Sequence, residues 1–176
     1  MLQGAGFDVY VIDTCSITDL EVNDRSSQLQ WNAQERARIL DGIERLILDG
    51  RMVTVSASRP EMQRHCPKSY DRFKGHKTRF FRLDTPELLA KVTEIFASWP
   101  TQARKVVTAP PNRDAADPYL IAYAEIHGCV LVTSEKPKRL RTKNNKTGLA
   151  IPDVCESRKP PIRWYSLVEL VNAERL

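Results

Sequence analysis

The apolar residues of this chain fall into short continuous runs and longer segments with helical spacing. The continuous runs predict buried β-strands at Val9 to Ile12, Met52 to Val55, Cys129 to Thr133 and Ile162 to Tyr165. The segments with helical spacing predict helices that begin near Trp31, Ser58, Thr85, Asp117 and Ser166. No element is predicted in the polar stretch from Asp19 to Gln30, and Cys66 to Leu83 is expected to be irregular or to form a short helical segment.

Strands and helices alternate along the sequence, and this order predicts the layout of the fold. Such alternation is typical of a three-layer α/β/α sandwich with a central, mostly parallel sheet, here of four to five strands. Neither an internal repeat nor a change of composition divides the 176 residues, so we expect residues 1–176 to form a single domain.

The composition, with 41% hydrophobic and 28% charged residues, is typical of a soluble globular protein. The first residues lack a basic segment followed by an apolar run, and no apolar stretch approaches the length of a membrane span. We therefore expect a cytoplasmic protein without a membrane partner. The four cysteines contain no CxxC pair, which argues against a zinc knuckle or a redox dithiol.

Three acidic residues stand where a predicted strand ends or a predicted helix begins. Asp13 follows the first strand, Asp117 opens a helix, and Glu135 comes just after the next strand. The carboxyl ends of parallel strands share one edge of a sheet, so these side chains are expected in one crevice. Carboxylates crowded together repel one another unless a cation joins them, which favours a metal site.

Each of these acids also has a purely structural explanation. Asp117 before Pro118 suits a helix N-cap, which is the stronger explanation of that residue taken alone. Asp13 suits an Asx turn in its own loop, and Glu135 suits a surface charge beside Lys136. The three acids together favour the metal site, because three unrelated structural roles are a weaker explanation for three acids that share one edge.

The formal net charge of +5 is distributed unevenly, with two basic tracts. The tract 136–146 has no acid and contains Lys136, Lys138, Arg139, Arg141, Lys143 and Lys146. The tract 68–82 interleaves six cations with Tyr70, Phe73, Phe80 and Phe81. Cations neutralise phosphates and rings stack on unpaired bases, so both tracts suit a nucleic acid partner. Taken singly, each is better explained as solvated surface with its aromatic residues in the core.

Two blocks of sequence resemble a known family. They are VIDT at residues 11–14 and ADPYLIAYAEIHGCVLVTSE at residues 116–135. This order of an acid, a small-residue helix, a glycine, a strand and T-x-acid resembles the PIN-domain nucleases. More narrowly, the helix led by Trp31, the DP pair at 117–118, the basic loop and IPDVC at 151–155 resemble a poorly characterised PIN-like bacterial subfamily. The resemblance spans nearly the whole chain, and it implies a PIN-like fold with a metal-dependent nuclease activity.

The resemblance also implies roles for particular residues. It implies four catalytic acids, Asp13, Glu61, Asp117 and Glu135, the last standing where aspartate is more usual. Metal ligands would be Asp13, Asp117, Glu135 and an additional acid, Asp153, assisted by the hydroxyl groups of Thr14, Ser16 and Thr133. Nucleic acid would bind to Lys136, Lys138, Arg139, Arg141 and Lys143.

Hard carboxylate oxygens without a histidine or thiolate cluster favour Mg²⁺ or Mn²⁺ over zinc. One such ion, or two about 4 Å apart, would promote hydrolysis of a phosphodiester. We therefore expect a metal-dependent endoribonuclease acting on single-stranded RNA. By family analogy alone, it would be the toxin of a toxin–antitoxin pair, with an antitoxin protein and a second copy of the chain as candidate partners.

The main alternative is a noncatalytic PIN-like module that binds RNA or a protein partner. Two departures from the family pattern support it, the glutamate at position 135 and the imperfect sequence context of Glu61. An aspartyl phosphatase is disfavoured because it needs a second acid two residues after Asp13, where this chain has Cys15. A dinucleotide site is disfavoured because no glycine-rich turn follows the first strand.

Overall fold

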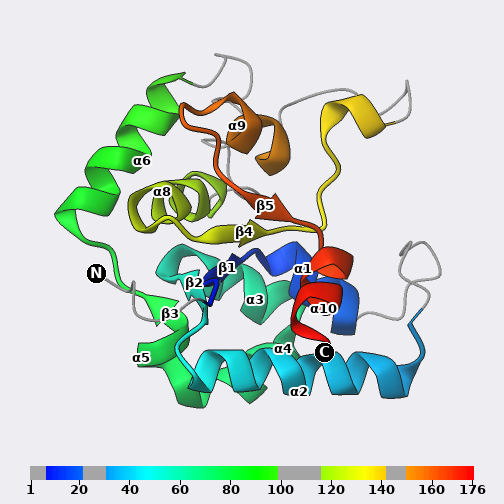
Figure 1. Cartoon of the computed structure of the whole chain (residues 1–176). Coiled ribbons are helices and arrows are strands. Elements are labelled where there is room, and N and C mark those ends of the chain that lie inside the picture. The colour runs from blue at the N-terminus through cyan, green and yellow to red at the C-terminus, as the bar shows by residue number, and fades with distance from the viewer. Residues whose placement is uncertain (1–6, 22–30, 99–115, 142–149) are drawn as a thin grey trace.

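A computed structural model describes residues 7–21, 31–98, 116–141 and 150–176 of the chain. The strands in these ranges are β1 (Tyr10–Ile12), β2 (Met52–Val55), β3 (Phe81–Arg82), β4 (Val130–Val132) and β5 (Trp164–Tyr165). They form one sheet in the order β3-β2-β1-β4-β5, and every pairing between neighbours is parallel (Figure 1). The predicted α/β class with a parallel sheet is therefore confirmed.

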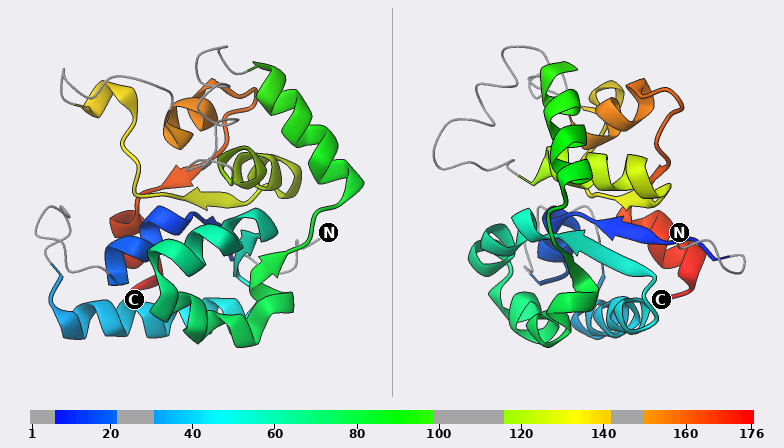
Figure 2. Two further views of the ribbon diagram at one scale, coloured as in Figure 1. Left: turned by 180° about the vertical axis from the view of Figure 1, so that it is seen from behind. Right: turned by 90° about the vertical axis from the view of Figure 1, so that its left-hand side faces the viewer.

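Helices cover both faces of the sheet, which gives the predicted three layers (Figure 2). One face packs against α1 (Thr14–Glu21), α2 (Ala33–Leu48), α3 (Arg59–His65), α4 (Pro67–Phe73), α5 (Lys77–Phe80) and α10 (Leu167–Glu174). The other face packs against α6 (Pro86–Ser98), α8 (Asp117–His127) and α9 (Ile151–Ser157). In the ranges described, no helix combines the length and the apolar character needed to cross a membrane.

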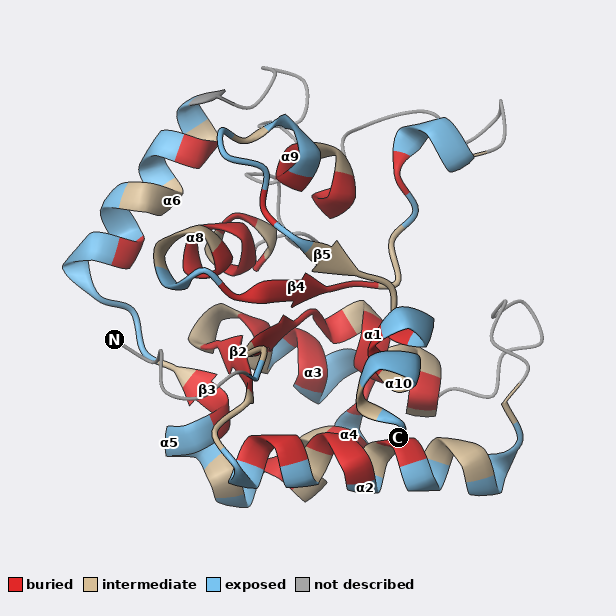
Figure 3. Ribbon diagram, in the orientation of Figure 1, coloured by how far each residue is buried: buried red, intermediate tan, exposed pale blue. Residues whose placement is uncertain are grey.

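The central strand β1 is apolar throughout because both of its faces are buried. Tyr10 and Ile12 pack into the core that includes α2, whereas Val11 packs into the core that includes α8. Figure 3 shows the middle of the sheet in the red of buried residues. A strand covered on both sides has no solvent-facing positions, so its sequence does not alternate between polar and apolar residues. Since β1 pairs with both β2 and β4, the residue that follows it, Asp13, lies in the middle of the carboxyl edge of the sheet.

The predicted helix boundaries agree with the structure at several positions. Asn32 starts α2 in a capping box with Glu35, and Ser166 starts α10 in the same way with Glu169. Gly128 ends α8 with φ of 64°, a left-handed conformation that glycine adopts without a steric penalty. These local signals fix where α2 and α10 begin and where α8 ends before β4.

The structure also contains a helix that the apolar pattern does not predict. Helix α1 begins directly after Asp13, at Thr14. Its large buried apolar side chains are Ile17 and Leu20. Two apolar positions in eight residues give too weak a periodic signal to separate a short helix from a loop.

The stretch from Cys66 to Leu83 forms α4, the 3₁₀ segment η2 (Lys74–His76), α5 and the short edge strand β3. The rings of Phe73, Phe80 and Phe81 pack edge to face, with neighbouring centroids 5.4 and 4.8 Å apart. Arg72 is bound to Glu44 of α2 at 2.7 Å. The explanation of this tract as surface with its aromatic residues in the core is therefore confirmed for Phe73, Phe80 and Phe81. Arg72 is held against α2 by its ion pair.

Candidate functional site

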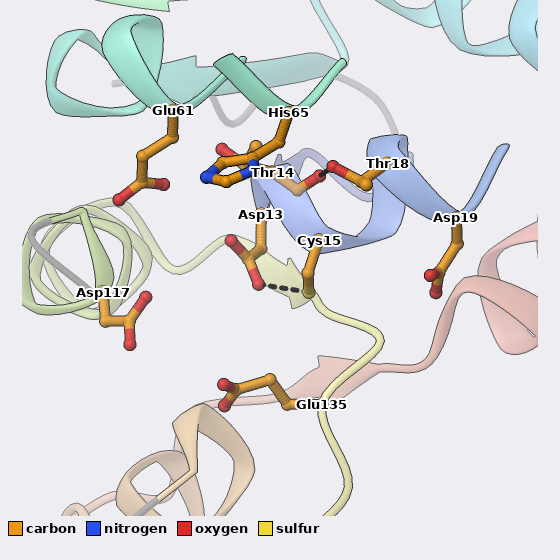
Figure 4. Close-up of a pocket in the computed structure, with 9 residues that line it drawn as sticks. All are labelled: Asp13, Thr14, Cys15, Thr18, Asp19, Glu61, His65, Asp117 and Glu135. Atoms are coloured by element: carbon orange, nitrogen blue, oxygen red, sulfur yellow. Dashed lines mark hydrogen bonds between the residues drawn. The ribbon is translucent and has the colours of Figure 1, made fainter. Parts of the chain in front are cut away.

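A pocket of about 240 Å³ lies at the carboxyl edge of the sheet (Figure 4). Its walls come from the end of β1 with the start of α1, from α3, from the first residue of α8 and from the loop after β4. The described residues that line it are Asp13, Thr14, Cys15, Thr18, Asp19, Glu61, His65, Asp117 and Glu135. The pocket therefore brings together the four acids expected from the sequence, and none of these lining residues is a lysine or an arginine.

Asp13 occupies this place because it extends the middle strand by one residue. Its N–H donates to the carbonyl of Val132 at 2.9 Å, which continues the pairing of β1 with β4. The residue is 5% exposed, and its Oδ2 accepts hydrogen bonds from the Thr133 hydroxyl at 3.0 Å and the Cys15 thiol at 2.6 Å. Both of these side-chain donors are uncharged groups.

Burial raises the pKa of Asp13 above that of an ordinary aspartate, because water no longer stabilises the negative charge. Hydrogen bonds from the Cys15 and Thr133 side chains, and from the N–H groups of Cys15 and Thr14, lower this pKa and offset part of the shift. With no lysine or arginine among the described lining residues, a positive charge is what the environment of this carboxylate lacks. A metal ion would supply it.

Glu61 enters the pocket from the first turn of α3, the helix that follows β2. Pro60 suits this helix start, since the first turn has no intrahelical acceptor for its N–H groups. Glu61 is 8% exposed, and His65, one turn later, also lines the pocket (Figure 4). The structure thus places Glu61 with the other acids, while its part in catalysis stays a prediction.

Asp117 is the first residue of α8, one position beyond the N-cap. The N-cap is Ala116, whose carbonyl accepts a hydrogen bond from the N–H of Leu120 at 3.0 Å. The explanation of Asp117 as the N-cap is therefore wrong, because the helix starts one residue earlier than that role requires. In Figure 4 its carboxylate lies beside the pocket together with those of Asp13 and Glu61.

Glu135 is positioned by hydrogen bonds of both its backbone and its side chain. Its N–H donates to Oγ1 of Thr133 at 3.1 Å, and its Oε2 accepts from the N–H of Ile151 at the start of α9 at 2.7 Å. Thr133 therefore links two of the acids, because its hydroxyl donates to Asp13 and accepts from the backbone of Glu135. Figure 4 shows Glu135 on the opposite side of the pocket from Glu61.

The donor set at the pocket fits a hard divalent cation, since the carboxylates offer oxygen ligands. The hydroxyl oxygen of Thr14 is buried and has no hydrogen-bond partner within the described ranges, a rare condition for a buried polar atom. No three His, Cys, Asp or Glu side chains in those ranges are grouped closely enough to hold an ion directly. An ion bound in this pocket would therefore be held partly through its own waters, as Mg²⁺ usually is.

Four lining residues have no role in the sequence-based prediction, namely Cys15, Thr18, Asp19 and His65. The first three follow the i, i+3, i+4 spacing of one face of α1, so the prediction misses them because it misses that helix. Burial and the neighbouring charge of Asp13 raise the pKa of the Cys15 thiol well above its usual value, which keeps the thiol a hydrogen-bond donor. The available signal for His65 is its position four residues after Glu61 on α3.

Three of the residues predicted for the metal site lie outside the pocket lining, namely Asp153, Ser16 and Thr133. Thr133 still contacts the site, because its hydroxyl donates to Asp13. The carboxylate of Asp153 accepts from the N–H of Ala150 at 3.1 Å and from the N–H of Lys138 at 2.8 Å, so it stabilises the start of α9. Ser16 is fully buried, and its hydroxyl lies 3.4 Å from that of Ser134. The predicted roles of Asp153 and Ser16 in a metal site therefore gain no support from the structure.

The predicted nucleic-acid contacts lie on the loop after Glu135 and comprise Lys136, Lys138, Arg139 and Arg141, whereas Lys143 falls outside the described residues. Arg139 is bound to Glu156 at 2.6 Å, and Nε of Arg141 donates to the carbonyl of Lys136 at 2.7 Å. The side chains of Lys136 and Lys138 are exposed. Arg139 is exposed as well, whereas the side chain of Arg141 is only 16% exposed.

Comparison with protein families places the chain in a group whose function is not established. Residues 10–176 match the family described as "Domain of unknown function (DUF4411)". Comparisons with curated proteins and with solved structures gave no match. The matched range runs from β1 to the end of the chain and contains the five carboxylates that line the pocket. The chain therefore belongs to the DUF4411 family.

Proposed function

We propose that this protein is a divalent-metal-dependent ribonuclease of the PIN-like type, cleaving single-stranded RNA. The observation that carries the proposal is the convergence of Asp13, Glu61, Asp117 and Glu135 on one pocket from four separate segments. Such a cluster without a lysine or arginine among the described lining residues is electrostatically unfavourable unless a cation binds there. An RNA substrate would place this activity in the cytoplasm.

The four carboxylates would hold Mg²⁺ or Mn²⁺, with Asp13 kept in place by the Thr133 and Cys15 side chains. The bound ion supplies positive charge that stabilises the attacking and leaving oxygens of a phosphodiester. Lys136 and Lys138 would hold the RNA backbone beside the pocket, since both are exposed and follow Glu135 directly. In this arrangement acids bind the ion and lysines bind the strand.

The test measures cleavage of a mixed single-stranded RNA by the purified protein with Mg²⁺ or Mn²⁺ and with EDTA. We expect cleavage that EDTA abolishes, and Asp13→Asn or Asp117→Asn should each lower the rate by at least about a hundredfold, since an ion ligand contributes several kcal/mol to transition-state stabilisation. Asp71→Asn is the matched control, because Asp71 is an exposed acid of α4 outside the pocket. Activity that survives both pocket substitutions would overturn the site assignment.

One observation favours a second candidate, a noncatalytic PIN-like module that binds RNA or a protein partner. The described residues contain no three acidic, histidine or cysteine side chains grouped closely enough to hold an ion directly. This candidate predicts binding to RNA without cleavage at any concentration of Mg²⁺ or Mn²⁺. The same assay separates the two, because the ribonuclease proposal requires metal-dependent products.

The toxin role rests on family analogy alone and is proposed on that basis. If the chain is a toxin, its expression should arrest bacterial growth, and Asp13→Asn should relieve the arrest. A partner encoded beside it should relieve the arrest of the unmodified chain and bind it during purification. Growth that is equally unaffected by both chains would remove this part of the proposal.

A further inference from the structure

The wall of the pocket opposite Glu135 carries the imidazole of His65. His65 is the only lining residue in the described ranges whose side chain contains nitrogen; the others offer oxygen or sulfur. It stands one helical turn after Glu61, and Figure 4 shows both side chains coming from α3 on the same side of the pocket. The residue is exposed, so a ligand that enters the pocket can reach its ring.

Two exposed cations lie close to His65 in the chain, where α3 ends and α4 begins. They are Arg64 and Lys68, and neither side chain forms an ion pair with a carboxylate of the described residues. Arg72, one turn further along α4, is instead bound to Glu44 at 2.7 Å. The cations of the tract 68–82 therefore differ in their surroundings: Arg72 is bound to α2, whereas Lys68 is exposed beside the end of α3.

Glu21 lies beside this pair of cations, but its carboxylate binds backbone N–H groups and not their side chains. Glu21, the last residue of α1, accepts hydrogen bonds from the N–H of Lys68 at 3.1 Å and from the N–H of Ser69 at 2.8 Å. Its carboxylate stabilises the start of α4, and the ammonium group of Lys68 projects from an exposed residue. The α3–α4 junction, defined here as Arg64, His65 and Lys68, thus lies at the end of the helix that carries Glu61, and its member His65 lines the pocket.

We propose that the α3–α4 junction binds the phosphate backbone of single-stranded RNA on the side of the pocket opposite Lys136 and Lys138. The inference rests on the proposed function and extends it. RNA would contact basic residues on both sides of the acidic pocket, so the strand crosses the pocket and does not end in it. His65 would donate a ring N–H to a phosphate oxygen next to the acids.

The chemistry of the pocket calls for contacts of this kind. The acids repel a polyanion, and metal binding offsets that repulsion only at the ion itself. Cations on one side alone would hold one flank of the strand and leave the other unsupported. With cations on both sides, each lost phosphate contact should weaken binding and reduce its dependence on salt in a measurable way.

The experiment measures equilibrium binding of a short, fluorescently labelled single-stranded RNA by anisotropy in EDTA, where no metal-dependent turnover occurs. We expect Arg64→Ala/Lys68→Ala to reduce the slope of log K against log salt by roughly 1.4, about 0.7 for each lost contact to a single strand. The matched control is Lys77→Ala/Lys159→Ala, which removes two exposed lysines outside the pocket lining. The control should lower the slope by less than half as much.

His65 is tested in the same assay with two substitutions. His65→Ala should weaken binding by about tenfold, the loss expected for one hydrogen bond to a charged group. His65→Gln keeps an N–H donor and should recover most of that loss. If His65→Ala binds like the unmodified chain, or if Gln is no better than Ala at an unchanged melting temperature, the assignment of His65 as a phosphate donor fails.

Other outcomes decide the wider proposal. If the two double variants change the salt slope equally, the α3–α4 junction is not an RNA surface. The same holds if no RNA binds at low salt either in EDTA or, with the Asp117→Asn chain, in Mg²⁺. Competition by polyglutamate as effective as that by unlabelled RNA would show a general polyanion patch and would also overturn the proposal. RNA binding that depends on the junction, combined with no cleavage in Mg²⁺ or Mn²⁺, would instead sustain this inference and remove the ribonuclease activity.

Discussion

The two edges of the sheet handle buried negative charge in opposite ways. At the amino edge, the carboxylate of Glu174 accepts hydrogen bonds from both terminal nitrogens of Arg51 at 2.6 and 2.8 Å and from the hydroxyl of Tyr10 at 2.6 Å. At the carboxyl edge, the side-chain donors to Asp13 are a neutral thiol and a neutral hydroxyl. One carboxylate has a cation from the protein, and the other does not.

The pKa shifts follow this difference. Burial alone would raise the pKa of Glu174, but the hydrogen bonds from Arg51 and Tyr10 outweigh it and lower that pKa. For Asp13, burial outweighs the hydrogen bonds from neutral donors and the pKa rises. The comparison teaches that burial of an acid is tolerated for different reasons at the two edges. At the amino edge the protein itself supplies the cation, whereas at the carboxyl edge the proposed function requires one from outside the chain.

The largest expected effect is stabilisation by the metal itself. Mg²⁺ or Mn²⁺ at about 100 times its dissociation constant should raise the free energy of unfolding by about 2.7 kcal/mol, because the ion binds the folded state. That corresponds to a rise in Tm of roughly 5 to 10 °C for a chain of this size. Differential scanning fluorimetry with and without EDTA measures it. An equal rise in Asp13→Asn would mean that the ion binds elsewhere.

The next effect tests the amino edge. Glu174→Gln should lower the free energy of unfolding by about 2 kcal/mol, since Arg51 loses a partly buried charged partner. The lowered pKa of Glu174 stabilises the fold above the ordinary glutamate pKa, and this contribution is lost as the pH falls through the lowered value. Denaturant titrations should therefore give different free energies of unfolding for the variant and the unmodified chain at neutral pH, and equal ones at acid pH. A difference that persists at acid pH would contradict the electrostatic explanation.

The smallest effect has the opposite sign. In EDTA at neutral pH, Asp13→Asn should leave Tm unchanged or raise it, with a gain of up to about 1 kcal/mol. The raised pKa of Asp13 means that its contribution to stability is present below the ordinary aspartate pKa and is lost as the pH rises through the raised value. Thermal melts across this pH range should show the Tm values of Asp13→Asn and of the unmodified chain becoming equal at acid pH. A large fall in Tm at neutral pH would mean that Asp13 is structural.

The sequence predicts the sheet well because its strands are buried on both faces. β1 and β4 read as unbroken apolar runs, and the turn signals between elements, such as Gly128, are local. The edge strand β3 escapes prediction, since it has two residues and owes its place to pairing with β2. Helix α1 escapes as well, because packing against the core stabilises it more than its own periodicity reveals.

The site is predictable only where it depends on strand ends. Asp13 and Glu135 follow adjacent parallel strands, so topology alone places them at one edge. The sequence also predicts Asp153 near this edge, but its carboxylate is used by the N–H groups of Ala150 and Lys138. Which acid faces a pocket and which one caps a helix depends on tertiary contacts that spacing does not encode.

The central position of β1 has a consequence for how the protein is made. Asp13 and Glu135 come to the same edge only when β4 pairs with a strand formed near the start of the chain, 120 positions earlier. Contacts of such long range form late in folding. A nascent chain that has not yet exposed β4 would carry β1 and α3 but no complete pocket, so the ability to bind the ion would arise only when most of the sheet has been synthesised.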